Sequence, residues 1–277
     1  MTFGNQVSWG DDKKFKIDKP IRLIELFSGI GSQAKSLFSI KADFEHHRVC
    51  EWDKYAVTAY NAIHGTDFKP SDITKITAND LAVADTNRYC YILTYSFPCT
   101  DLSPAGKTKG MAKGSGTRSG LLWEVERLLG ECKDLPQILL MENVPEVEGG
   151  KNLHHFTEWV KFLESLGYKS FSKILNATGF GVPQNRERDF MVSILGDYHY
   201  EFPKERPLEI CLADVLEDDV DEKYYLTAEQ LLKIQLCNYV HNANRIQSGG
   251  GNCRTLTAHD AKMPTCVRLS VAAVEEA

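Results

Sequence analysis

The sequence lacks the features that mark several large protein classes. Its 277 residues contain no run of about 18 or more apolar residues, the length that a membrane-spanning helix needs. The first 20 residues are polar and charged, without the apolar run of a secretory signal peptide, so we expect a cytoplasmic protein with no membrane partner. Repeats and low-complexity tracts are absent too, which excludes repeat architectures.

Paired cysteine motifs are also missing. The eight cysteines are scattered and none forms a C-x-x-C pair, so the ligand spacing of a structural zinc module is absent. A cytosolic chain keeps its thiols reduced, and most of these cysteines are expected to be small buried apolar residues. We therefore expect neither disulfides nor a bound metal.

The chain has no overall excess of basic residues, because its net charge is −6. This balance argues weakly against a nucleic-acid partner, which favours basic surfaces. Between Asp101 and Arg118, however, four cationic residues accompany a single acid, so the segment carries a net charge of +3. The cations are Lys107, Lys109, Lys113 and Arg118. A solvated loop and an anion-binding loop both fit this pattern.

The apolar residues that are present, 43% of the chain, are ample for a packed core. Short apolar runs predict strands over 21–27, 48–52, 89–95, 137–141 and 190–195. Amphipathic spacing predicts helices over 32–40, 54–64, 120–132 and 154–166. This alternation predicts an α/β fold, a parallel sheet with helices on both faces. We expect an N-terminal extension over 1–20, a catalytic domain over 21–198 and a small irregular region over 199–277.

Ligands of such sheets bind beyond the carboxyl ends of the strands, where several candidate residues lie. The glycine-rich turn 27–31 suits either a ligand that approaches the backbone or a tight connection. Glu51 and Trp52 close the second strand; they suit ribose hydroxyls and adenine, or an ordinary surface strand end. Asp72 and Ile73 suit an adenine amino group or a turn cap. These three segments, each following the last in the chain, are together typical of a nucleoside pocket.

Three further candidates flank later strands. Cys99 follows Pro98 just beyond the third strand and beside the basic segment, where a thiolate nucleophile and a structural thiol are both possible. Glu142 ends the fourth strand, and burial without a partner would be unfavourable, so it is exposed or contacts a substrate. Arg186 and Arg188 precede the last strand and suit an anion, a carbonyl oxygen or ion pairs with neighbouring acids.

Together, four motifs in this order resemble those of the DNA (cytosine-5)-methyltransferases. They are F-x-G-x-G at 27–31, P-C-x-x-x-S at 98–103, E-N-V at 142–144 and Q-x-R-x-R at 184–188. The resemblance covers about 21–195 and implies a Rossmann-like, S-adenosylmethionine-dependent enzyme that methylates carbon 5 of cytosine in double-stranded DNA.

The resemblance also implies roles for the candidate residues. Cys99 would add to carbon 6 of a flipped base, Glu142 would contact ring nitrogen 3 and the exocyclic amine, and Arg188 would hold the 2-carbonyl. Arg186 would support a phosphate or the loop that carries the sulfur, and segment 107–118 would close over DNA. The implied S-adenosylmethionine contacts are Phe27, Gly29, Ile30, Gly31, Glu51, Trp52, Asp72, Ile73, Pro98 and Leu121.

The C-terminal third departs from the family pattern. Residues 249–267 resemble late recognition-domain sequence, and the family's returning segment and last helix are missing. We therefore expect Leu23, Ile24 and neighbouring apolar residues to lack cover, and a second chain or a second copy to bind there. Two alternatives stay open: an RNA cytosine-5 methyltransferase, and a truncated chain that is inactive without a partner.

Overall fold

The computed structural model describes residues 14–102, 109–217, 220–230, 246–248, 250–254 and 266–268. Contacts divide the chain into two compact units, one of residues 1–174 and 188–202 and one of residues 175–187 and 203–277. This division differs from the predicted boundary at residue 198, because residues 175–187 group with the second unit. Ser103, Lys107 and most of segment 249–267 lie outside the described residues.

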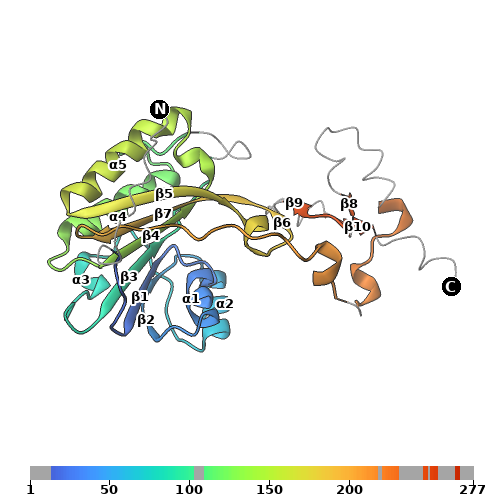
Figure 1. The fold of residues 1–277 in the computed structure, drawn as a ribbon, viewed down its shortest axis with the longest axis horizontal. Helices are drawn as coiled ribbons and strands as arrows, with labels where there is room; N and C mark the ends of the chain where they lie inside the picture. The colour runs from blue at the N-terminus through green and yellow to red at the C-terminus, as the bar shows by residue number, and fades with distance from the viewer. Residues whose placement is uncertain are drawn as a thin grey trace. The chain divides into compact units, whose positions relative to one another are not determined.

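A six-stranded sheet forms the centre of the first unit (Figure 1). Its spatial order is β2-β1-β3-β4-β7-β5. The strands are β1 (Ile21–Leu26), β2 (Phe44–Cys50), β3 (Cys90–Tyr95), β4 (Ile138–Asn143), β5 (Tyr168–Asn176) and β7 (Glu187–Leu195). The pairs β1–β2, β1–β3 and β3–β4 are parallel. β7 runs antiparallel to β4, which corrects the prediction of a wholly parallel sheet.

The reversed direction of β7 decides where its first residues lie. In the register with β4, Asn143 pairs with Asp189 and Glu142 pairs with Phe190. The start of β7 therefore lies beside the end of β4, at the same edge of the sheet as the carboxyl ends of the parallel strands. Arg188 and Asp189, near the start of β7, consequently lie at the edge where ligands of α/β sheets bind.

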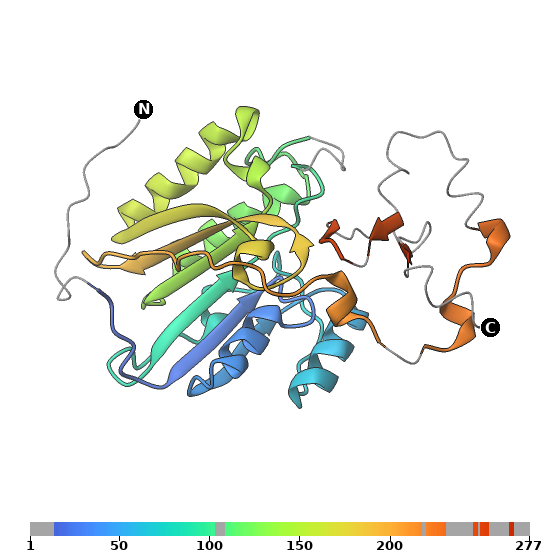
Figure 2. The same cartoon turned by 45° about the vertical axis from the view of Figure 1, so that its right-hand side comes forward.

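Helices cover both faces of the sheet, as predicted, and all four predicted helices are present within two residues of their expected bounds (Figure 2). On one face lie α3 (Ala78–Leu81), α4 (Leu122–Glu131) and α5 (Leu153–Ser165), whose apolar side chains join the main core. On the other face lie α1 (Ser32–Ser39) and α2 (Lys54–His64). Short 3₁₀ helices are η2 (Ser119–Leu121), η3 (Pro145–Val147) and η4 (Gly150–Asn152). Among the helices in the described part of the chain, none has the length and apolarity to cross a membrane.

The expectation that Leu23 and Ile24 lack cover is wrong. Leu23 is 1% exposed and packs in a cluster with Ala34 of α1, whereas Ile24 is 0% exposed and belongs to the main core on the opposite face. β1 is an inner strand, with β2 and β3 as neighbours, so helices of this chain cover both of its faces. The inference of a second chain that rested on this patch therefore loses its basis.

Both edge strands differ from the sequence prediction. β2 begins at Phe44 rather than at Arg48, and its added residues include the polar Glu45 and His47. β5 was not predicted, because its sequence mixes small polar, charged and apolar residues without a buried run. Edge strands carry polar side chains more readily than inner strands, since one side of the strand faces no partner.

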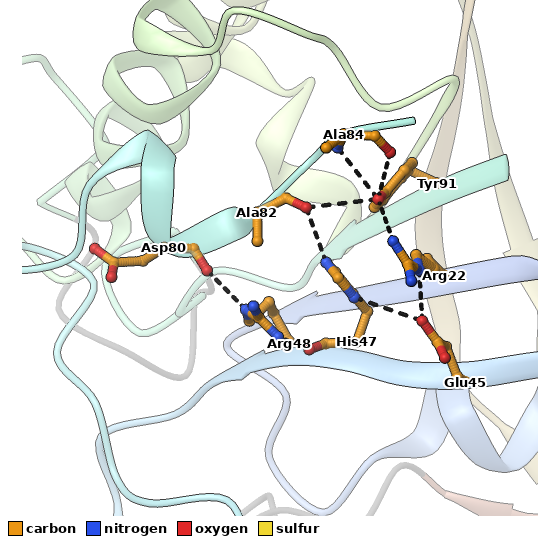
Figure 3. A network of polar contacts seen from close by, with 8 residues as sticks. All are labelled: Arg22, Glu45, His47, Arg48, Asp80, Ala82, Ala84 and Tyr91. Atoms are coloured by element: carbon orange, nitrogen blue, oxygen red, sulfur yellow. Dashed lines mark hydrogen bonds and ion pairs between the residues drawn. The ribbon is translucent and has the colours of Figure 1, made fainter. Parts of the chain in front are cut away.

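A polar network fixes the amino ends of β1, β2 and β3 (Figure 3). Arg22 Nη1 donates to Tyr91 Oη at 2.9 Å, and Arg22 Nε donates to Glu45 Oε1 at 2.5 Å. Tyr91 Oη in turn donates to the Ala84 carbonyl at 2.7 Å. These contacts tie three strands to the segment before β3, at the end of the sheet opposite to the candidate site.

The described part of the second unit is irregular. It contains two small parallel strand pairs, β6 (Gln184–Asn185) with β9 (Cys253–Arg254) and β8 (Ile246–Ser248) with β10 (Cys266–Arg268). Its 3₁₀ helices are η5 (Ala177–Phe180), η6 (Leu212–Val215) and η7 (Glu222–Tyr224). Such an architecture fits the expectation of a small irregular C-terminal region.

Candidate active site

A pocket of about 340 Å³ lies at the carboxyl ends of β1, β2 and β3. Its lining consists of Phe27, Cys50, Glu51, Trp52, Ser71, Asp72, Ile73, Ser96, Pro98, Arg118 and Leu121. Seven of the ten predicted cofactor contacts are among them, so the fold brings residues that are far apart in the sequence into one pocket. The size is within the range of small-molecule sites.

Two backbone amides hold the Glu51 carboxylate at the pocket wall. Its Oε2 accepts from the Gly29 amide and its Oε1 from the Asp53 amide, both at 2.9 Å. The neighbouring Trp52 side chain is 70% exposed, which leaves its indole available for stacking. A fixed carboxylate beside an exposed aromatic ring suits the ribose and the base of a nucleoside.

Asp72 caps a turn and also lines the pocket. Its Oδ1 accepts from the Thr74 amide at 3.0 Å and from Thr74 Oγ1 at 2.8 Å, so it caps a turn. These bonds hold the pKa of Asp72 below its ordinary value. The same residue lines the pocket next to Ile73, whose side chain is buried. The turn cap therefore fixes the carboxylate at the pocket rather than excluding it from a binding role.

The turn between β1 and α1 is supported from behind by α2. Ile30 and Gly31 are not among the described residues that line the pocket. His64 Nε2 lies 3.1 Å from the Ile30 carbonyl oxygen. A Cβ added at Gly31 would lie 2.3 Å from His64 Nε2 and 2.6 Å from Tyr60 Cε2. The close approach of α2, together with a φ of +84°, explains the glycine at this position.

Beneath this turn lies a buried carboxylate that the sequence analysis missed. Glu25 accepts from the Ala34 amide at 3.2 Å and from the Tyr60 hydroxyl at 2.5 Å. Burial raises the pKa of Glu25, and these two bonds oppose the rise. The carboxylate thus anchors the start of α1 to α2. Its signal in the sequence is the lone acid in the apolar strand Ile-Arg-Leu-Ile-Glu-Leu.

Gly31→Ala is expected to destabilise the protein by about 2–4 kcal/mol more than Gly29→Ala, because it adds a steric clash to backbone strain. Gly29 is the matched control: its φ is +54°, and a Cβ there meets no atom within 4 Å. Urea unfolding of both variants measures the difference. Equal losses of stability in the two variants would show that α2 does not constrain Gly31.

Cys99 lies just beyond β3, in a segment that is held through its backbone. Asn143 Nδ2 donates to the Phe97 carbonyl at 3.0 Å, which links the segment to the end of β4. Ser119 Oγ donates to the Pro98 carbonyl at 2.6 Å, which links it to η2. The two carbonyls that precede Cys99 are therefore both fixed.

Other cysteines of the first unit have different surroundings. Cys50 and Cys90 are buried, and burial raises the pKa of both thiols, that of Cys90 to about 11. Burial raises the pKa of the half-buried Cys132 to about 11 as well. These thiols stay protonated near neutral pH and are poor nucleophiles. Cys99 is half-buried and directly follows Pro98, which lines the pocket.

Glu142 and Arg188 form an ion pair at the edge between β4 and β7. Arg188 Nε lies 3.0 Å from Glu142 Oε1, and the side chains are 17% and 23% exposed, respectively. Glu142 is therefore paired within the protein and still partly accessible, and a substrate contact for it stays a prediction. The antiparallel direction of β7 explains how a residue at the start of one strand meets a residue at the end of another.

Arg186 belongs to the second unit, whereas Arg188 belongs to the first. The Arg186 amide donates to Asn176 Oδ1 at 3.2 Å, and its carbonyl accepts from the Ala177 amide at 3.0 Å. Its backbone is thus fixed within the second unit. A substrate contact for Arg186 stays a prediction.

The described cations of the basic segment have different environments. Lys113 forms an ion pair with Glu126 of α4, at 2.5 Å, and lies over the Trp123 ring. Arg118 lines the pocket, where its guanidinium carbon is 5.7 Å from the centre of the Trp52 ring. The sequence analysis assigned Arg118 to a loop that closes over DNA and did not foresee its place in the pocket.

The geometry can now be compared with known proteins. The model of the C-5 cytosine-specific DNA methylase family matches residues 21–262. The chain belongs to the C-5 cytosine-specific DNA methylases. Enzymes of this family use S-adenosylmethionine to methylate carbon 5 of cytosine in DNA, which agrees with the resemblance carried by the four motifs.

Individual members of the family are similar over much of the chain. The orphan methyltransferase M.SssI of Spiroplasma monobiae is 35% identical over 82% of this chain and 72% of its own length. The type II methyltransferase M2.ScrFI of Lactococcus lactis subsp. cremoris is 45% identical over 50% of this chain and 38% of its own length. The chain thus spans only part of each of these cytosine methylases.

A solved methylase structure supports the fold. The Dnmt2 methyltransferase of S. pombe has a TM-score of 0.68 with this chain at 24% sequence identity. The match covers 87% of this chain and 72% of that protein. At this level of identity the likeness establishes a shared architecture and leaves the nucleic-acid substrate to direct experiment.

Proposed function

We propose that this chain methylates carbon 5 of cytosine in DNA, with Cys99 as the nucleophile and the pocket at Trp52 as the S-adenosylmethionine site. The observation that carries the proposal is the order of the strands. The pocket follows β1 and β2, Cys99 follows β3, and the Glu142–Arg188 pair lies on β4 and β7. The nucleophile therefore follows β3, which lies between β1 on the side of the cofactor pocket and β4 on the side of the ion pair.

The reaction begins when the Cys99 thiolate adds to carbon 6 of a cytosine that has left the helix. A bond forms between Sγ and carbon 6, and the electron pair of the carbon 5–carbon 6 double bond shifts to carbon 5, from which it is delocalised through carbon 4 onto ring nitrogen 3. Glu142 contacts ring nitrogen 3 and the exocyclic amine, and Arg188 holds the 2-carbonyl, where negative charge develops. Carbon 5 becomes nucleophilic as a result.

The residues of the pocket fit a nucleoside cofactor. Trp52 would stack on the adenine, Glu51 would bind the ribose hydroxyls, and Asp72 would bind the adenine edge. When bound, S-adenosylmethionine supplies an electrophilic methyl group for carbon 5. Loss of the carbon 5 proton to a base and elimination of the Cys99 thiolate then restore the aromatic ring and free the enzyme.

The experiment that tests the proposed function is methyl transfer from isotopically labelled S-adenosylmethionine to two substrates, mixed-sequence duplex DNA and transfer RNA. The products are digested to nucleosides and identified by mass spectrometry. We expect labelled 5-methyl-2′-deoxycytidine from the DNA. Label only in the RNA would favour the RNA methyltransferase, and labelled N4-methyl-2′-deoxycytidine would contradict the role of Cys99.

Trp52→Ala is expected to weaken S-adenosylmethionine binding about ten- to hundredfold, since base–aromatic stacking contributes about 1–3 kcal/mol. The matched control is Tyr55→Ala, because Tyr55 is similarly exposed at 74% but does not line the pocket. Titration calorimetry measures both dissociation constants. Unchanged affinity in Trp52→Ala and also in Glu51→Ala would remove these residues from the cofactor site.

A further inference from the structure

Asp101, two residues after Cys99, has a function that the proposed mechanism does not use. It is 5% exposed, and its Oδ2 accepts from the Arg118 amide at 2.9 Å and from the Ser119 amide at 3.3 Å. A carboxylate at this depth needs such bonds, and the first turn of η2 provides them. Asp101 therefore joins the start of the basic segment to its end.

A second set of bonds closes a ring around Cys99. The Asp101 amide donates to Ser119 Oγ at 3.2 Å, and Ser119 Oγ donates to the Pro98 carbonyl at 2.6 Å. The Ser119 hydroxyl thus donates to the residue before Cys99 and accepts from the second residue after it. Ser119 is completely buried, so water does not compete for these bonds. The backbone on both sides of Cys99 is fixed to one serine.

The same carboxylate also reaches the cofactor pocket through Arg118. The Arg118 amide is bound by Asp101, while the Arg118 side chain lies over the Trp52 ring and lines the pocket. A shift of the Asp101 carboxylate would therefore displace the flanks of the nucleophile and the cation beside the indole together. No other described side chain accepts a bond from the Arg118 amide.

We propose that Asp101 is a positioning residue that sets the Cys99 segment and Arg118 relative to each other, and so couples the nucleophile to the cofactor pocket. The inference rests on the proposed function, because it assigns Cys99 and the pocket their roles there. It predicts that the two effects can be separated by mutation. Loss of the Ser119 side chain should affect only the Cys99 segment, loss of the Arg118 side chain should affect cofactor binding, and loss of the Asp101 carboxylate should affect both.

The test uses the full chain with Asp101→Ala, Asp101→Asn, Ser119→Ala, Arg118→Ala and the double variant Asp101→Ala/Arg118→Ala. Two quantities are measured for each. One is the rate of denaturant-stable adduct formation with mixed-sequence duplex that contains 5-fluorocytosine, at saturating S-adenosylmethionine. The other is the S-adenosylmethionine dissociation constant from calorimetry. Asp80→Ala is the matched control, since Asp80 also accepts a backbone amide, that of Thr77, away from the site.

Asp101→Ala is expected to slow adduct formation at least tenfold, because small misplacements of a nucleophile have large effects on rate. It should weaken S-adenosylmethionine binding about two- to fivefold, the size expected for losing an exposed cation–π contact. Ser119→Ala should slow adduct formation without changing the affinity for S-adenosylmethionine, and Arg118→Ala should weaken that affinity. The double variant Asp101→Ala/Arg118→Ala should bind S-adenosylmethionine with the same affinity as Asp101→Ala alone. Asp101→Asn keeps an acceptor oxygen and should therefore form the adduct at nearly the rate of the unchanged chain.

A purely structural role for Asp101 predicts a different result, in which rate and affinity fall only in proportion to the folded fraction, as for Asp80→Ala. Such a result, or an adduct rate in Asp101→Ala within twofold of the unchanged chain, would overturn the inference. If Asp101→Ala does not fold, Ser119→Ala and Asp101→Asn decide the question by the same two measurements. Adduct formation by Cys99→Ala would instead refute the proposed function itself, so the two failures are distinguishable.

Discussion

Cys99→Ala is expected to reduce methyl transfer to DNA by about four or more orders of magnitude, the effect usual for the loss of a covalent nucleophile. Alanine cannot form the bond to carbon 6, and without that bond carbon 5 of cytosine is too weak a nucleophile. Binding of S-adenosylmethionine should stay near normal, because the pocket ends at Pro98 and Cys99 is not among its described lining residues. Incorporation of tritiated methyl groups into mixed-sequence duplex DNA measures the loss.

Cys132→Ala is the matched control for this substitution. Cys132 is also half-buried, but burial raises the pKa of its thiol to about 11 and it lies at the end of α4. Its replacement should change the rate less than about threefold, as for other changes away from the site. Comparable losses in both variants would mean that thiol removal acts through folding, and the assignment of Cys99 would be wrong.

Asp189→Asn is expected to stabilise the protein at pH 8 by about 1–3 kcal/mol. Asp189 is completely buried on β7, directly after Arg188, and the group that acts on its carboxyl is the acidic Glu148 side chain rather than a cation. Burial, and after it the nearby Glu148 carboxylate, raises the pKa of Asp189 to about 7. Ionisation of this group in the folded protein is therefore unfavourable.

The sign of the pH dependence follows from this pKa. The pKa of Asp189 is about 7 in the folded protein and about 4 in an unfolded chain. The unfolded chain then releases its proton first, and the contribution of Asp189 to stability is lost as the pH rises from about 4 to about 7. A rise of about three pKa units corresponds to at most about 4 kcal/mol, and the burial of the polar asparagine amide offsets part of the gain.

Chemical unfolding at a series of pH values tests this prediction. The difference between Asp189→Asn and the unchanged chain should grow between about pH 4 and pH 7 and then stay constant. Asp197→Asn is the control, because Asp197 lies just beyond the same strand but is 70% exposed and pairs with Lys169. That change should alter the stability by less than about 1 kcal/mol at any pH. A less stable Asp189→Asn at pH 8 would contradict the account.

Much of the site could be predicted because its residues follow strands whose apolar runs are easy to recognise. The runs that became β1, β3 and β4 are inner strands: β3 is buried at every residue, β1 at all but one, and β4 at every second residue. Their carboxyl ends identify the turn 27–31, Cys99 and Glu142. Helix spacing was informative for a related reason, since α4 buries one full stripe against the sheet.

The features that were missed depend on tertiary pairing. The direction of β7 is set by its partner strand and leaves no periodic signal, although it is what brings Arg188 to Glu142. Arg118 reaches the pocket because Asp101 binds its amide, a contact between residues that local patterns do not connect. The side chains of α2 explain why residue 31 is a glycine, which no local pattern indicates, and its contact with the cofactor stays a prediction.

The expected gap over Leu23 and Ile24 shows a limit of reasoning from a family pattern. The absence of a family segment suggested an uncovered strand, but burial depends on which elements are present. Ala34 of α1 contributes to the cover of Leu23, and the main core covers Ile24. Only the packed structure decides whether an apolar side chain has a partner.

The most direct test of the central claim is peptide mapping of the trapped complex. The chain is incubated with S-adenosylmethionine and duplex DNA containing 5-fluorocytosine, and the denatured adduct is digested with trypsin and nuclease for mass spectrometry. We expect the modified base, carrying a methyl group at carbon 5, on the peptide that contains Cys99 and on no other cysteine. A base attached to a different residue, or the absence of any adduct while methylated cytosine accumulates in ordinary duplex, would contradict the mechanism.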